Sequence, residues 1–108
     1  MSDTKIPSWM TLTADRVTVK LSVPSEANGV RVDTLSLRAP TVRDLRNARE
    51  AFPSDEEKQD EYLYTSLAEI GTKDLDGLLV KDLNRLQAGY FRLVQDDELR
   101  PESAKTTR

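Results

Sequence analysis

Hydrophobic and polar residues alternate without interruption in the segment RVTVKLSV, residues 16–23. Such alternation is typical of an antiparallel strand with one buried face, which here consists of Val17, Val19, Leu21 and Val23. We expect Pro24 to end the strand, because proline has no N–H to donate to a neighbouring strand. Asn28 and Gly29 then supply a turn, since both residues tolerate positive φ.

The second strand of this hairpin changes face part-way along, with its apolar residues on opposite sides: Val30 and Val32 on one, Leu35 and Leu37 on the other. A tight two-residue turn would place polar residues opposite the leucines. A continuous apolar face instead requires Val23 opposite Leu35 and Leu21 opposite Leu37. We therefore expect an odd-numbered loop or a bulge near residues 33–34, because a one-residue slip exchanges the faces of a strand.

The segment LSLRAPTVRDL, residues 35–45, changes from a period of two to a period of three, which indicates a strand followed by a helix. Pro40 keeps the residue before it extended and ends the strand. Thr41 is the expected N-cap, with Asp44 three residues later, close to a capping box. The helix that follows ends before Pro53 and has an apolar stripe of Val42, Leu45, Ala48 and Phe52.

Three further helical segments are predicted. Ser54 and Glu57 form a capping box at the start of the first, and Gly71 is its natural stop; its main stripe is Leu63, Leu67 and Ile70, with Tyr62, Tyr64 and Ala68 beside it. The segment KDLDGLLV is a short helical turn. The last helix has a stripe of Leu83, Leu86, Tyr90 and Leu93, widened by Phe91 and Val94. We expect Gly89 to permit close packing of another helix.

The order of these elements predicts an α+β fold, with an N-terminal antiparallel β-hairpin followed by three to four short α-helices. We expect a single domain over residues 10–94, preceded by a flexible arm at residues 1–9 and followed by a disordered polar tail at residues 95–108. Trp9, at the end of the arm, either closes one side of the core or anchors a partner.

The composition excludes several kinds of chemistry. The chain has 108 residues, of which 37% are hydrophobic, and contains no cysteine and no histidine. Thiolate ligands, the commonest general base and the usual nucleophilic pairs are therefore missing. We expect that the protein is not an enzyme, that it has no catalytic residues and that it binds no metal or cofactor. The sequence shows neither an apolar run long enough to span a membrane nor a signal peptide, so the expected compartment is the cytoplasm.

Charge narrows the choice of partners. Charged residues make up 32% of the chain and the net charge is -3, which argues against general nucleic-acid binding. Arg43, Arg46 and Arg49 recur every three residues on the first helix, either as a solvated face or as a surface for an acidic partner. A small DNA-binding regulator is a competing interpretation of this stripe. A domain of this size has a modest stability margin, to which shared surfaces in a homo-oligomer would add.

Several pieces of the sequence, in this order, resemble the small tail assembly chaperone family of Mu-like and related contractile-tailed phages. The resemblance covers roughly residues 6–94, from the arm IPSW through the NG turn and LSLRAPTVRDL to LLVKDLNRL. The residues that look like the family's signature are Leu37, Arg38, Pro40, Thr41, Asp44, Leu79, Asp82 and Leu83. None of them is a catalytic motif, and we expect them to be structural, with Arg38 bonding helix carbonyls or pairing with Asp44 or Asp82.

The resemblance implies an assembly factor of a phage or prophage that acts in the bacterial cytoplasm and is absent from the mature virion. Such chaperones coat the helical tape measure protein, keep it soluble and help deliver tail tube subunits. Candidate partner-binding residues are Val30 and Val32 on the exposed part of the ribbon, Tyr62 and Tyr64, and Tyr90 and Phe91, each of which could instead lie in the core. The alternative is a structural tail component, an initiator or connector that stays in the particle.

Overall fold

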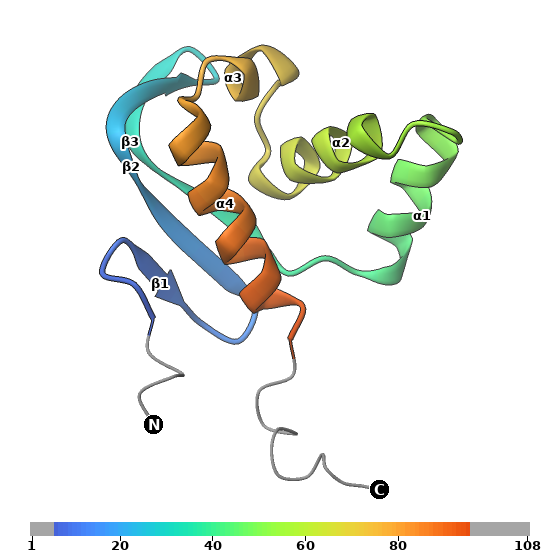
Figure 1. Ribbon diagram of the computed structural model, residues 1–108, viewed down its shortest axis with the longest axis horizontal. Helices are drawn as coiled ribbons and strands as arrows, with labels where there is room; N and C mark the ends of the chain where they lie inside the picture. The colour runs from blue at the N-terminus through green and yellow to red at the C-terminus, as the bar shows by residue number, and fades with distance from the viewer. Residues whose placement is uncertain (1–5, 96–108) are drawn as a thin grey trace, which may run out of the picture.

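The computed structural model describes residues 6–95, and the fold is α+β, as the sequence predicts (Figure 1). Three antiparallel strands form one sheet in the order β1-β2-β3. They are β1 (Met10–Leu12), β2 (Arg16–Ala27) and β3 (Val30–Arg38). Four helices follow: α1 (Val42–Ala51), α2 (Glu56–Ala68), α3 (Thr72–Asp76) and α4 (Val80–Leu93). Residues 1–5 and 96–108, which include most of the predicted arm and tail, lie outside the described residues.

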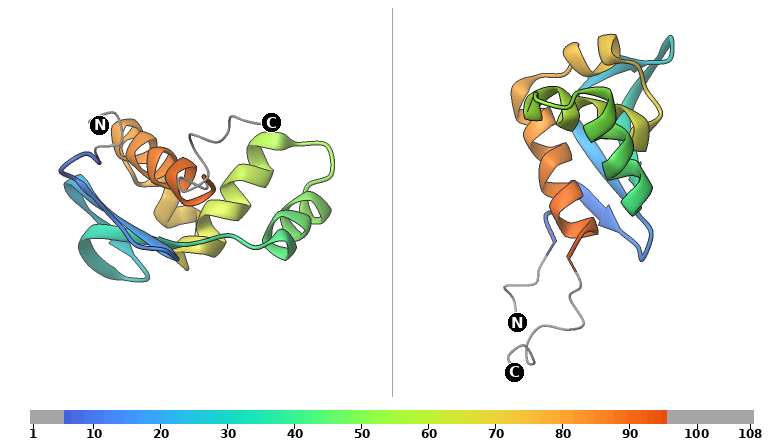
Figure 2. Two further views of the ribbon diagram at one scale, coloured as in Figure 1. Left: turned by 90° about the horizontal axis from the view of Figure 1, so that it is seen from below. Right: turned by 90° about the vertical axis from the view of Figure 1, so that its right-hand side faces the viewer.

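The helices lie on one side of the sheet (Figure 2). They do not contribute equally to the core, because α1 adds no residue to the buried cluster. α4 runs across β2, and α2 packs beside β3 (Figure 1). α1 packs against α2 and lies away from the sheet. The buried cluster between the sheet and the helices consists of Met10, Val17, Val19, Leu21, Ala27, Leu35, Leu37, Leu63, Leu67, Leu75 and Leu86. Ile6 and Trp9, from the segment expected to be an arm, pack against this cluster.

The hairpin contains the expected irregularity, but not the expected register. Asn28 and Gly29 form a tight turn with φ of 56° and 81°, and β2 continues through Pro24 to Ala27. Next to this turn Ala27 pairs with Val30, whereas farther along Val19 pairs with Leu35 and Val17 with Leu37. The prediction of Val23 opposite Leu35, and of Leu21 opposite Leu37, is therefore wrong.

The irregularity lies mainly in β2. Residues 21–24 separate the two registers, and only Asp33 lies opposite them in β3. The register thus shifts by three residues, an odd number that exchanges the two faces of the strand. Pro24 is tolerated within β2 because the ladder is interrupted there. Val23 leaves the apolar face as a result and is 44% exposed, contrary to the prediction.

The first helix has its predicted position but not its predicted packing. α1 begins after Thr41 and follows the expected limits, yet Ala48 is its one buried residue, and Val42 is 65% exposed. The physical reason is that α1 packs against α2 and not against the sheet, with an edge-on contact between Phe52 and Tyr62. Most of the predicted apolar stripe is therefore uncovered.

The ends of α2 and the packing of α4 also differ from the predictions. Asp55, and not Ser54, caps α2, because its side chain accepts a hydrogen bond from the backbone N–H of Lys58 at 3.1 Å. α2 ends before Glu69, whose φ is 59°, while Gly71 caps α3. Gly89 packs against β2 and not against a helix: a Cβ there would lie 3.1–3.3 Å from methyl groups of Val17 and Val19.

Candidate functional site

Arg38, Thr41 and Asp44 join the end of β3 to the start of α1. The Arg38 guanidinium donates to both oxygens of Asp44, with Nη1–Oδ2 and Nη2–Oδ1 distances of 2.8 and 3.1 Å. Asp44 also accepts the backbone N–H of Thr41 at 2.8 Å, while the Thr41 hydroxyl accepts the backbone N–H of Asp44 at 3.2 Å. These contacts confirm the capping box and select Asp44 as the partner of Arg38.

Three groups of two neighbouring residues stabilise the ionised form of Asp44. The hydrogen bond from Arg38, then the backbone and hydroxyl of Thr41, hold the pKa of Asp44 well below its usual range. The same ion pair raises the pKa of Arg38. The arrangement is a structural joint that fixes the direction in which α1 leaves the sheet.

Asp82 fastens the first turn of α4 to the irregular part of β2. It is 1% exposed, and it is the buried charged residue of the described part of the chain. One carboxylate oxygen accepts the backbone N–H of Ser22 at 2.8 Å and the other accepts the Ser22 hydroxyl at 3.0 Å. Because the register shift leaves residues 21–24 without regular partners in β3, the Asp82 carboxylate satisfies backbone that the sheet does not.

The remaining signature residues lie in the core or at the ends of strands and helices. Leu37 is fully buried and Leu83 packs against the core, whereas Leu79 is exposed just before α4. Pro40 lies at the joint between β3 and α1, where it ends the strand.

The candidate partner-binding residues separate into exposed and buried members. Val30 is 60% exposed beside the hairpin turn, but Val32 is partly buried and packs against the core. On the helices, Tyr62 is partly exposed and contacts the ring of Phe52, and Phe91 is 58% exposed. The other two tyrosines, Tyr64 and Tyr90, face each other with ring centroids 5.5 Å apart; Tyr64 is buried and Tyr90 packs against the core.

Burial changes the acidity of this tyrosine pair. It raises the pKa of Tyr64 to about 12, with smaller contributions from Asp60 and Tyr90. Burial and Asp60 also raise the pKa of Tyr90. Both hydroxyls are therefore neutral near pH 7, and the pair serves to pack α2 against α4.

Phe91 is one of three apolar residues that are exposed along one side of α4 and at its C-terminal end. Val80, Phe91 and Val94 are exposed along α4, and Val80 is the most exposed of them at 75%. Val80 and Phe91 are eleven residues apart, which corresponds to about three turns and returns to the same side of a helix. We call Val80, Phe91 and Val94 the α4 outer face.

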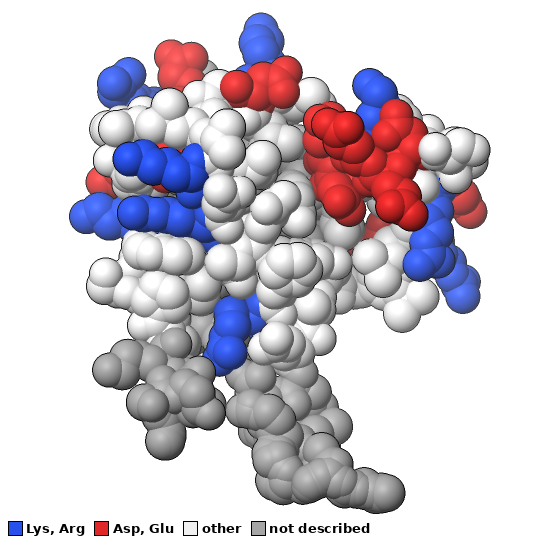
Figure 3. Space-filling model, in the orientation of Figure 1, with Lys and Arg blue, Asp and Glu red and all other residues white. Residues whose placement is uncertain are grey.

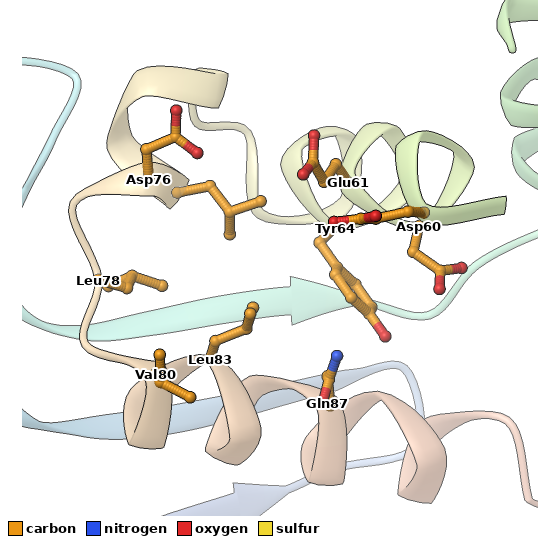
Figure 4. Close-up of a pocket in the computed structure, with 10 residues that line it drawn as sticks. Asp60, Glu61, Tyr64, Asp76, Leu78, Val80, Leu83 and Gln87 are labelled. Atoms are coloured by element: carbon orange, nitrogen blue, oxygen red, sulfur yellow. The ribbon is translucent and has the colours of Figure 1, made fainter. Parts of the chain in front are cut away.

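A groove lies between α2, α3 and α4, with a volume of about 340 Å³. Figure 4 shows Tyr64 projecting from α2 toward Gln87 of α4, with Leu78, Val80 and Leu83 nearer the start of α4. We call this the acidic groove, because its lining combines apolar side chains with four carboxylates, those of Glu57, Asp60, Glu61 and Asp76.

The carboxylates of the acidic groove are concentrated on one side of α2. Glu57, Asp60, Glu61 and Tyr64 follow a spacing of three and four residues, which places them together on a helix. Acidic side chains accordingly gather over α2 (Figure 3). This spacing is visible in the sequence, although the sequence alone does not show that α3 and α4 complete the groove. Residues 6–95 contain no cluster of three or more acids arranged to hold a metal ion.

The described residues form a small α+β domain with exposed apolar residues on α4 and an acidic groove. The family model of phage tail assembly chaperone proteins, E, or 41 or 14, matches residues 18–95. Because this match covers most of the chain, the protein belongs to that family and has a role in tail assembly. Neither a curated protein nor a solved structure gives a significant match. No helix within residues 6–95 is long and apolar enough to cross a membrane.

Proposed function

We propose that the protein binds the helical tape measure protein during tail assembly, keeps it soluble and helps recruit tail tube subunits to it. In this proposal the role is binding without catalysis, and the chain acts in the cytoplasm of the bacterial host. The finished virion would then contain no copies of it. The match to the tail assembly chaperone family supports the general role, and the exposed apolar side chains described next support a helical partner such as the tape measure protein.

The α4 outer face is the observation that carries the proposal. A long helical protein outside its assembled state exposes apolar stripes that promote aggregation, and a chaperone must cover them reversibly. Val80 and Phe91 are largely exposed and lie on one side of α4, separated by roughly 16 Å along the helix axis. A helix of the partner can lie along this face and bury its own stripe against it.

Co-expression with the long helical protein encoded beside this gene tests the proposal. We expect the partner to be soluble and to co-purify with the native chain. A Val80→Ser, Phe91→Ser variant should lose the complex, because it removes the apolar contact without disturbing buried residues. The matched control is Val23→Ser, Val30→Ser, which removes two exposed valines from the hairpin and should retain the complex.

Three results would count against the proposal or its binding surface. A partner that stays insoluble beside the native chain would contradict the solubilising role. Copies of the chain in purified virions, detected by mass spectrometry, would favour a structural tail component instead. Loss of the complex in the hairpin control alone would move the binding surface from α4 to the ribbon.

A further inference from the structure

The outward side of α1 is basic and is not covered by the rest of the described chain. Arg43, Arg46 and Arg49 are exposed, and Val42 is exposed among them. At 100° per residue, Val42, Arg46 and Arg49 project from the same side of the helix. Within residues 6–95, none of the three arginines has an ion-pair partner.

The acidic groove has the opposite character. In the described part of the chain, none of its four carboxylates forms an ion pair with a lysine or arginine. Burial and the nearby charge of Glu56 raise the pKa of Asp60 in this groove. The apolar residues between the carboxylates, among them Leu75 and Leu83, provide a floor for an apolar side chain.

We propose that α1 of a second copy of this chain occupies the acidic groove. The arginines of that helix face the groove carboxylates, and Val42 lies against the apolar floor. A second copy is the occupant that the observations favour, because the same chain presents both a basic amphipathic helix and an acidic groove of complementary charge. This inference rests on these two surfaces and does not depend on the tape measure protein being the client.

The positions of the two surfaces are compatible with a closed dimer. The acidic side chains over α2 and the basic side chains over α1 appear on the same face of the molecule (Figure 3). A two-fold axis between two copies that meet through this face would place each α1 over the α2 of the other copy. Both contacts would then form together, and no unpaired surface would remain to extend the assembly into a fibre.

Charge-swap variants of the full chain test the dimer, with sedimentation velocity as the readout. The first variant, Arg46→Glu with Arg49→Glu, makes α1 acidic. The second, Glu57→Lys with Glu61→Lys, makes the groove basic. The matched control, Glu26→Lys with Arg31→Glu, makes the same kinds of change at exposed positions of the hairpin. Circular dichroism establishes that each variant is folded.

The expected result is a dimer for the native chain and for the control, with dissociation favoured by high salt. Each charge-swap variant alone should dimerise at least about 10-fold more weakly, because its α1 and its groove carry the same sign. An equimolar mixture of the two variants should form a heterodimer, since each acidic α1 then meets a basic groove and each basic α1 meets an acidic one.

Three results would overturn the proposal. The native chain could be monomeric at all concentrations and salt conditions tested. The first variant could dimerise as strongly as the native chain. In the third result, the groove variant loses the tape measure protein in co-purification, while the α1 variant keeps both that protein and the native oligomeric state. This result would show that the groove binds the tape measure protein and not a second copy of the chain.

Discussion

Replacing Asp82 tests whether the buried carboxylate holds α4 on the sheet. Asp82→Ala removes the acceptor of two hydrogen bonds, one from the Ser22 backbone at 2.8 Å and one from its hydroxyl at 3.0 Å. A hydrogen bond to a charged group contributes about 1.5–3 kcal/mol. The alanine variant no longer has to desolvate a carboxylate, which offsets part of the loss. Water can also reach the half-buried Ser22. We therefore expect a net destabilisation of about 2–3 kcal/mol, at or below the lower end of the range of about 3–5 kcal/mol for breaking a buried charged pair.

Urea unfolding, followed by the fluorescence of Trp9, measures this loss. Trp9 is the one tryptophan of the chain and packs on the core, with the Arg85 guanidinium 5.1 Å from its ring centroid. In thermal unfolding the same change corresponds to a decrease in Tm of roughly 10–20 °C. Asp82→Asn keeps an acceptor for the Ser22 N–H and should cost only about 1 kcal/mol, as expected for the loss of charge assistance.

A double-mutant cycle with Ser22→Ala separates this contact from other effects of the substitution. The two residues should be coupled by about 1 kcal/mol, because their hydroxyl and carboxylate interact directly. Additive effects of the two substitutions, or an Asp82→Ala variant as stable as the native chain, would refute the reasoning.

Further outcomes are expected at four sites of the structure. Asp44→Ala should lower the free energy of unfolding by about 1–2 kcal/mol, from a lost cap and a partly exposed ion pair. The pKa of Asp44 is lower in the folded than in the unfolded chain, so its ionised form contributes to stability above the ordinary pKa of 3.8, and this contribution is lost as pH falls below that value. The free energy of unfolding of Asp44→Asn should therefore depend less on pH in this acid range than that of the native chain. Tyr64, with a pKa of about 12 in the folded chain and 10 unfolded, should contribute stability below pH 10 that is lost as pH rises toward 12, and Tyr64→Phe should remove this loss in alkaline unfolding experiments. Gly89→Val should destabilise by at least about 2 kcal/mol in urea, because its side chain would push α4 away from Val17 and Val19. Val32→Lys should lower Tm while Val30→Lys leaves it unchanged, since Val32 alone packs on the core; equal Tm values would contradict the register near the turn.

Local signals in the sequence predicted the local structure well. The hairpin turn at Asn28 and Gly29, the change from strand to helix at Pro40 and the capping box of Thr41 with Asp44 each depend on residues within a few positions of one another. Their conformations are set by steric preferences and short hydrogen bonds, so the residue types are sufficient to indicate them. The α+β order followed from these elements.

Features that depend on distant residues were not predictable in the same way. The register of β2 on β3 is stabilised at Ser22 by Asp82, sixty positions later in the chain. One side of α1 is uncovered because the contacts of Asp44 with Arg38 and Thr41 orient this helix away from the sheet. β1 has only three residues, too few for a periodic pattern to show. The acidic groove combines α2 with α3 and α4, although the spacing of its acids on α2 was visible.

Hydrogen–deuterium exchange of the chain, alone and in complex with the co-purified tape measure protein, tests the central claim most directly. If the α4 outer face covers the client, peptides spanning residues 80–94 should exchange more slowly in the complex, while the hairpin tip around Val30 should be unchanged. Slower exchange confined to the hairpin, or no change in α4, would contradict the proposed binding surface.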